Sequence, residues 1–150
     1  MIVLASDHAA IGLKDELVRV LRARGEAFRD LGPFDDSSVD YPDFAHLLVR
    51  EILDGRARRG ILICGTGIGM SMAANRHPGI RAALCHDAYT AGMARRHNDA
   101  NVLCLGARVI GSGVADQIVE VFLDTDFEGG RHQRRVAKIE PAAASRQEDS

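Results

Sequence analysis

Short apolar runs alternate with longer amphipathic segments along this chain, and this alternation constrains its fold more than any single motif. Runs typical of buried strands cover residues 2–5, 27–31, 61–64, 81–85 and 102–105. Segments typical of helices cover residues 9–24, 42–54, 68–76, 87–96 and 112–124, and a last helix is expected over 131–139. Strands that alternate with helices form βαβ units. The alternation therefore predicts an α/β fold with one parallel sheet.

The 150 residues predict one domain over residues 1–140, followed by a polar, flexible tail over 141–150. The net charge of −2 lacks the basic excess of a nucleic-acid binder, and no apolar stretch reaches the length of a membrane span. The chain opens on a strand-like run with neither a basic leader nor a cleavage site. We therefore expect an unprocessed, soluble protein of the cytoplasm that binds neither nucleic acid nor membrane.

The cysteines and histidines favour neither a disulfide framework nor a metal centre. Cys64, Cys85 and Cys104 are odd in number, widely spaced and each part of an apolar run, which indicates free thiols in a reducing compartment. Cys85 and Cys104 are expected to be inert core residues. The histidines are scattered without ligand spacing, so we predict no catalytic metal and no cofactor.

The segment 60–69 carries the most functional information. It reads Gly-Ile-Leu-Ile-Cys-Gly-Thr-Gly-Ile-Gly, an apolar run that ends on Cys64 and passes into three alternating glycines. The run suits a buried parallel strand, which places Cys64 at the carboxyl edge of the sheet. Ligands of open α/β sheets bind at that edge, and glycines there let backbone N–H groups approach an anion. This segment therefore offers a reactive thiol beside an anion cradle.

The glycines do not match the known nucleotide and phosphate loops. A dinucleotide motif needs a glycine at 70 or 72, where the chain has Met70 and Met72, and a Walker loop needs a lysine that this loop lacks. A thiol phosphatase of the Cys-x5-Arg type needs arginine in place of Met70. What remains is a glycine turn whose amides can hold a small oxyanion next to the thiol.

Several polar residues near predicted strand and helix ends allow two interpretations each. Cys64 is either a core residue or a thiolate favoured by the helix that follows the glycines. Asp7, together with His8, follows the first strand at the same sheet edge and either holds a polar ligand or caps the next helix. Thr66 is either a turn residue or a hydroxyl donor beside the loop amides. His97 can be a simple cation at a helix end.

The cluster Gly129-Gly130-Arg131-His132-Gln133-Arg134-Arg135 opens the last predicted helix. Arg131 and Arg135 stand four residues apart on one helical face. Two guanidinium groups on one face suit a phosphate dianion, whereas the alternative is a solvated basic surface.

Taken together, these motifs resemble the B-type ribose-5-phosphate isomerase family, which also includes galactose-6-phosphate and allose-6-phosphate isomerases. The resemblance covers residues 1–140 in the order of the family. The matching blocks are Ser6-Asp7-His8-Ala9, Asp40-Tyr41-Pro42, Cys64-Gly65-Thr66-Gly67-Ile68-Gly69, Ala73-Ala74-Asn75-Arg76, His97-Asn98, Gly106-Ala107-Arg108-Val109 and Gly130-Arg131-His132-Gln133-Arg134-Arg135. The family implies a single Rossmann-like, three-layer α/β/α domain with a five-stranded parallel sheet and an extra C-terminal helix. It also implies a homodimer with active sites at the subunit interface, while a dimer and a tetramer both stay open as the final assembly.

The resemblance further implies metal-free aldose–ketose isomerisation through a cis-enediolate. Cys64 would be the base that moves a proton between C1 and C2 of the sugar. Some members use a glutamate farther along the loop, but that position is Met70 here. Thr66 and the loop amides would stabilise the enediolate oxygen. The loop residues assigned to substrate binding are Gly65, Gly67, Ile68 and Gly69.

The same resemblance assigns the other site residues. His97, from the partner subunit, would act as acid and base in opening the furanose ring, while Asp7 would bind sugar hydroxyls or the ring oxygen. The residues assigned to the phosphate are His8, Arg131 and Arg135, joined by Arg108 across the interface, and those that orient the sugar are Tyr41 and Asn98.

The expected activity is therefore the interconversion of ribose 5-phosphate and ribulose 5-phosphate. Motifs do not fix pocket length, so erythrose 4-phosphate, allose 6-phosphate and galactose 6-phosphate remain alternative substrates. A non-catalytic sugar-phosphate sensor is a weaker alternative, because no output domain accompanies the pocket. A thiol hydrolase is disfavoured, because no residue pattern marks a partner that activates water.

Overall fold

The computed structural model describes residues 1–142 of the chain. The five strands in this part are β1 (Ile2–Ser6), β2 (Phe28–Asp30), β3 (Arg59–Cys64), β4 (Ala82–Leu84) and β5 (Val102–Gly106). The helices are α1 (Ile11–Ala23), α2 (Tyr41–Leu53), α3 (Ile68–Ala74), α4 (Ala88–Asn98), α5 (Ser112–Asp124) and α6 (Arg131–Ala137), with a short 3-10 turn (His8–Ala10) before α1. Residues 143–150 of the expected tail lie outside the described residues.

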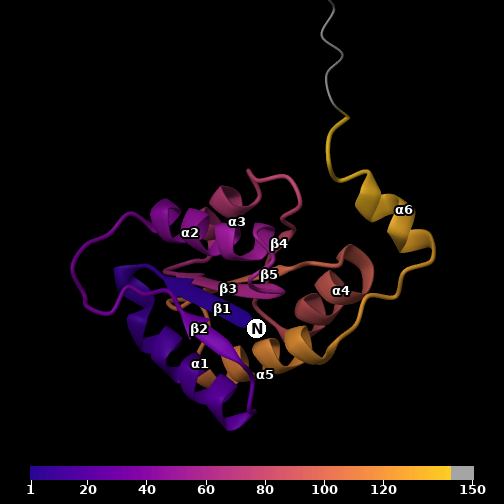
Figure 1. Ribbon diagram of the computed structural model, residues 1–150. Coiled ribbons are helices and arrows are strands. Elements are labelled where there is room, and N and C mark those ends of the chain that lie inside the picture. Colours follow the sequence, from indigo (N-terminus) through magenta and orange to yellow (C-terminus); the bar gives the residue numbers. More distant parts are fainter. Residues whose placement is uncertain (143–150) are drawn as a thin grey trace, which may run out of the picture.

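The strands form one parallel sheet in the order β2-β1-β3-β5-β4, which confirms the predicted five-stranded parallel sheet (Figure 1). From β1 the chain moves to β2 on one side and then to β3 on the other. The connections therefore diverge between β1 and β3, and in open α/β sheets ligands bind at the carboxyl ends of the strands at such a point. At this point the structure places the end of β1 at Ser6 and the end of β3 at Cys64.

The helices cover both faces of the sheet, so the predicted three-layer architecture is confirmed. Figure 1 shows α2 and α3 above the sheet and α1 and α5 below it. Side chains of β3 alternate between the two cores, since alternate residues of a strand point to opposite faces. Ile61 and Ile63 pack with α1, α4 and α5, whereas Leu62 and Cys64 pack with α2 and α3. The Cys64 thiol therefore lies on the α2–α3 side, at the carboxyl edge.

Single side chains explain where two predicted helices differ from the observed ones. Asp7 accepts a hydrogen bond from the N–H of Ala9 at 3.0 Å and starts the 3-10 turn, so regular α-helix begins only at Ile11. The Asn75 side chain exchanges two hydrogen bonds with the backbone of Ala82, at 2.8 and 2.9 Å, just after α3 ends. This exchange also fixes the start of β4. None of the helices in residues 1–142 is long and apolar enough to cross a bilayer.

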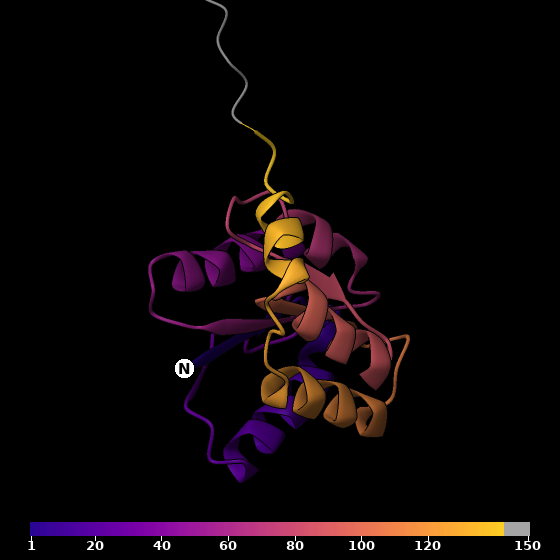
Figure 2. The ribbon, with the colours of Figure 1, turned by 90° about the vertical axis from the view of Figure 1, so that its right-hand side faces the viewer.

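The last helix stands apart from the sheet. α6 follows Gly129 and Gly130, both with positive φ, and packs against α4 (Figures 1 and 2). Only His132 is buried in α6, and Val136 is half-buried. The helix ends at Ala137, earlier than the predicted 139, and the Glu140 carboxylate then accepts the N–H of Gly79 at 2.7 Å. The predicted extra C-terminal helix is confirmed, and it packs against the end of α4.

Candidate active site

Cys64 is the last residue of β3 and is 5% exposed. Its thiol contacts the loop that follows the strand. The N–H of Gly67 donates to Cys64 Sγ at 3.1 Å. Gly67 has a φ of 78°, and the tight left-handed turn aims its amide back at the sulfur. An amide aimed at sulfur and a helix that begins directly afterwards are features of sites that hold a thiolate.

The other two cysteines are core residues, as the sequence predicts. Cys85 and Cys104 are buried free thiols. Burial raises the pKa of both thiols, far above the ordinary range for Cys104. Neither therefore competes with Cys64 as an ionised sulfur.

The loop amides are partly engaged within the loop. Besides the bond from Gly67 to sulfur, the N–H of Ile68 donates to Thr66 Oγ1 at 3.2 Å, so Thr66 acts as a turn residue here. Gly69 belongs to the first turn of α3, where an N–H has no acceptor within the helix. An oxyanion in this loop can therefore bind the Gly69 amide directly. To bind the Gly67 or Ile68 amide, it must displace the hydrogen bond that this amide makes within the loop.

Asp7 and His8 stand at the carboxyl end of the neighbouring β1. The Asp7 N–H donates to the carbonyl of Ile63 at 3.0 Å, which ties the turn to β3 beside the thiol. The Asp7 side chain caps the 3-10 turn, as the alternative interpretation of this residue predicted. His8 Nδ1 accepts the N–H of Val39 at 3.1 Å, so a neutral ring carries its proton on Nε2 and can donate it to a ligand.

Tyr41 and Arg108 flank the glycine loop. A Cβ at Gly69 would lie 2.5 Å from the Tyr41 ring, so the ring rests directly on that glycine. A Cβ at Gly65 would lie 3.3 Å from Arg108 Nη1, and the Arg108 N–H donates to the Gly65 carbonyl at 3.0 Å. The structure places Arg108 beside the loop of its own chain, where the resemblance implied that it arrives from a second subunit.

The remaining predicted residues lie at the opposite edge of the sheet. His97 and Asn98 end α4 just before β5 begins, and the start of β5 pairs with Gly60, while its end pairs with Cys64. The strand from Gly60 to Cys64 spans about 13 Å. The ring of His132 in α6 stacks on that of His97, with ring centroids 4.2 Å apart. Arg131 and Arg135 of α6 are exposed next to this stack.

One chain therefore presents two separate groups. The thiol half-site comprises Asp7, His8, Tyr41, the loop 64–69 and Arg108. The histidine half-site comprises His97, Asn98, Arg131 and Arg135. The predicted phosphate ligands are divided, since His8 belongs to the first group and the two α6 arginines belong to the second.

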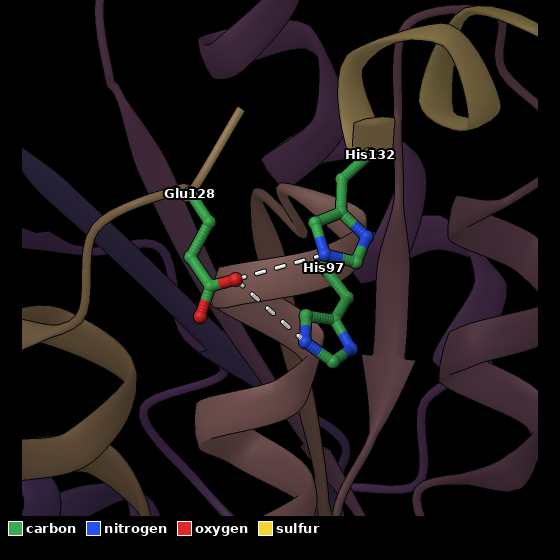
Figure 3. A group of neighbouring side chains, drawn as sticks. All are labelled: His97, Glu128 and His132. Atoms are coloured by element: carbon green, nitrogen blue, oxygen red, sulfur yellow. Dashed lines mark ion pairs between the residues drawn. The ribbon is translucent and has the colours of Figure 1, made fainter. Parts of the chain in front are cut away.

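Sequence reasoning missed the immediate neighbours of His97. Glu128 Oε2 lies 3.9 Å from His97 Nε2 and 3.6 Å from His132 Nε2 (Figure 3). Burial, followed by the charges of His97 and Arg131, lowers the pKa of His132. Glu128 and His132 are four residues apart, which is a weak signal because Glu128 precedes α6, and nothing in the sequence indicates that His97 joins them.

This chain is similar to known proteins over almost its whole length. A family model described as Ribose/Galactose Isomerase matches residues 2–139. Ribose-5-phosphate isomerase B of Escherichia coli is 44% identical over 138 residues, covering 92% of this chain and 93% of that protein. D-erythrulose-4-phosphate isomerase of Pectobacterium atrosepticum is 46% identical over 140 residues, covering 92% of this chain and 91% of that protein. The crystal structure of a ribose 5-phosphate isomerase from Thermotoga maritima superposes with a TM-score of 0.92 at 51% identity, covering 94% of this chain and 97% of that one.

Proposed function

Because the chain belongs to the ribose/galactose isomerase family and is an aldose–ketose isomerase, we propose that it interconverts ribose 5-phosphate and ribulose 5-phosphate with Cys64 as the base. One observation carries the proposal. Cys64 Sγ lies where β1 and β3 end side by side, with the Gly67 amide 3.1 Å away. A buried thiolate facing amide donors is a competent base for proton transfer next to a carbonyl.

In the proposed reaction, the thiolate removes the proton from C2 of the open-chain aldose. The C2–H electron pair forms the C1–C2 double bond of a cis-enediolate, and the negative charge moves to O1. The thiol then returns the proton to C1, while the proton of the C2 hydroxyl passes to O1, which leaves the ketose. The Gly69 amide and the Thr66 hydroxyl, both in the segment that follows Cys64, are the donors that can stabilise the enediolate oxygen.

We propose that two chains complete each site. The thiol half-site has no imidazole at hand besides His8, and His97 of the same chain lies at the other edge of the sheet. A homodimer that joins the thiol half-site of one chain to the histidine half-site of the other brings the partner's His97 to the sugar ring, where it opens the furanose. The same pairing unites His8 with the α6 arginines around the phosphate.

A tetrose phosphate is the second candidate substrate. It is favoured because a relative named for D-erythrulose 4-phosphate is as similar to this chain as one named for ribose 5-phosphate. A coupled assay over ribose, erythrose, erythrulose, allose and galactose phosphates decides between them, since the preferred substrate has the highest kcat/KM.

The test of the base is Cys64→Ala, with Cys85→Ala, a buried cysteine directly after β4, as the matched control. We expect Cys64→Ala to lose both turnover and solvent-deuterium incorporation at C2 while it still binds the sugar phosphate. Cys85→Ala should keep both. Retained deuterium exchange in Cys64→Ala would remove Cys64 as the base.

A reducing, cytoplasmic setting is part of the proposal. Its support is chemical: all three cysteines are free, and a thiolate base works only while it is not oxidised.

A further inference from the structure

Where α4 meets α6, two imidazoles and one carboxylate point at a common volume (Figure 3). One ring nitrogen of each histidine and one Glu128 oxygen all lie within 4.8 Å of one another. We propose that this cluster binds a divalent transition-metal ion of the Zn²⁺ class, and that the bound ion inhibits the enzyme through His97. The metal site stands on geometry alone, and only its effect on turnover rests on the proposed function.

The donor set matches the chemistry of such an ion. Two imidazole nitrogens and a carboxylate oxygen are a common set of protein ligands for Zn²⁺, with water in a fourth position. Tetrahedral bonds of about 2.0–2.1 Å place ligand atoms about 3.3 Å apart. The two measured separations from Glu128 Oε2 are 3.6 and 3.9 Å, a few tenths of an ångström longer than this spacing. Ca²⁺ and Mg²⁺ prefer oxygen ligands and fit this set poorly.

The cluster is held in place by backbone contacts and leaves its ligand atoms available. The Glu128 N–H donates to the Arg96 carbonyl at 3.0 Å, which fixes the segment before α6 against the end of α4. Within residues 1–142, no side-chain hydrogen bond engages the His97 ring, the His132 ring or the Glu128 carboxylate; the two histidine–carboxylate separations exceed hydrogen-bond length. His132 is 6% exposed and stacks on His97 with an interplanar angle of 10°.

Access is also suitable. Within a single chain the His97 side chain is 40% exposed and that of Glu128 is 51% exposed, so an ion can reach both ligands from the side that faces the sugar in the proposed site. The parallel rings must tilt toward each other for both nitrogens to face one ion, and the exposed His97 ring has room to do so.

Coordination at His97 would interfere with ring opening. An imidazole that opens a furanose must alternate between proton donor and acceptor. When Nε2 binds a metal, Nδ1 keeps its proton, so the ring can no longer act as a base. The ion should therefore inhibit turnover of ribose 5-phosphate, whereas erythrose 4-phosphate, which forms no furanose, should be spared.

The binding test uses tag-free protein, stripped with a chelator, in the Cys64→Ser background so that the reactive thiol cannot bind the ion. Titration with Co²⁺, followed by its visible absorption, should give one site per chain with the strong bands of tetrahedral cobalt. His132→Ala and Glu128→Ala each remove one ligand and should weaken Co²⁺ binding by at least about 100-fold. Loss of a residue that only orients a ligand costs about 10–100-fold, so the two cases can be told apart. Glu128 is exposed, so Glu128→Ala keeps the test valid if the buried His132→Ala variant folds poorly. His46→Ala, which alters a different histidine pair, is the control and should bind as tightly as its parent.

Equal Co²⁺ affinity in Glu128→Ala, or an octahedral spectrum, would overturn the metal site. The turnover test adds Zn²⁺ to the protein with Cys64 intact and compares each variant with its own metal-free rate. Inhibition that persists unchanged in Glu128→Ala, or that affects erythrose 4-phosphate equally, would refute inhibition through His97. A protein without isomerase activity would overturn the proposed function but leave the Co²⁺ experiment intact.

Discussion

Replacement of Gly67 by alanine tests the turn that aims an amide at the thiol. The residue has a φ of 78°, and its Cβ would lie 2.6 Å from Leu84 Cδ1 and 2.9 Å from the carbonyl carbon and oxygen of Leu105. A left-handed conformation costs a non-glycine residue about 1–2 kcal/mol. Overpacking against backbone adds about 1–3 kcal/mol. We therefore expect Gly67→Ala to lower the free energy of unfolding by about 2–5 kcal/mol.

Two other glycines separate the conformational cost from the packing cost. Gly25 also has a positive φ, of 69°, but open space around its Cβ position, so Gly25→Ala should cost only the conformational part, about 1–2 kcal/mol. Gly113 in α5 has neither feature, and Gly113→Ala should be neutral or stabilising by up to about 1 kcal/mol. Urea unfolding, followed by circular dichroism at a fixed protein concentration, measures all three.

The same series reports on catalysis. If the loop cannot close on Cys64, kcat should fall by about 100-fold or more under conditions where the variant is folded, because a misplacement of about 1 Å is enough to cost that much. Gly25→Ala and Gly113→Ala should keep the normal kcat. A Gly67→Ala protein with unchanged unfolding midpoint and kcat would refute the account of this turn.

Three further predictions concern other parts of the molecule. The buried Lys14 ammonium donates to both Asp30 oxygens, at 2.7 and 2.8 Å. Asp30→Asn removes this charged partner and should lower the free energy of unfolding by about 3–5 kcal/mol. A loss below about 1 kcal/mol in urea unfolding would contradict this. Burial, helped by the neighbouring His46, lowers the pKa of His77, so the unfolded chain binds more protons than the folded one below about pH 6.5 and stability should fall as pH drops through this range. His77→Gln should flatten that pH dependence between pH 7.5 and 5, whereas the exposed-site control His86→Gln should not; identical curves for all three proteins would argue against it. His97→Asn should lose turnover of ribose 5-phosphate but keep that of erythrose 4-phosphate, and equal loss in the coupled assay on both sugars would refute a role confined to ring opening.

The sequence predicts the architecture well because its signals are local. Apolar runs and amphipathic segments alternate strongly enough to locate every strand and helix to within a few residues. Two boundaries that moved depend on individual side chains that bond to backbone outside their own helix: Asp7 starts the 3-10 turn before α1, and Asn75 bonds to the backbone of Ala82 after α3. Propensity within a segment carries no information about such a contact.

The site was predictable in part. Position after an apolar run was enough to place Cys64, Asp7 and His8 at one edge of the sheet, because parallel strands all end there. The roles of these residues came from the resemblance to a family. The division into two half-sites, and the meeting of His97 with Glu128, depend on how α6 packs on α4. That packing joins segments far apart in the chain and has no signature in either one alone.

Complementation between two inactive variants tests most directly the claim that Cys64 and His97 act in one site built from two chains. Cys64→Ala and His97→Asn are each expected to be inactive on ribose 5-phosphate. When the two are co-expressed, every mixed dimer should contain one site with both substitutions and one site with neither. Random pairing should then restore about a quarter of the wild-type rate per chain. No recovery in verified mixed dimers would contradict a shared site.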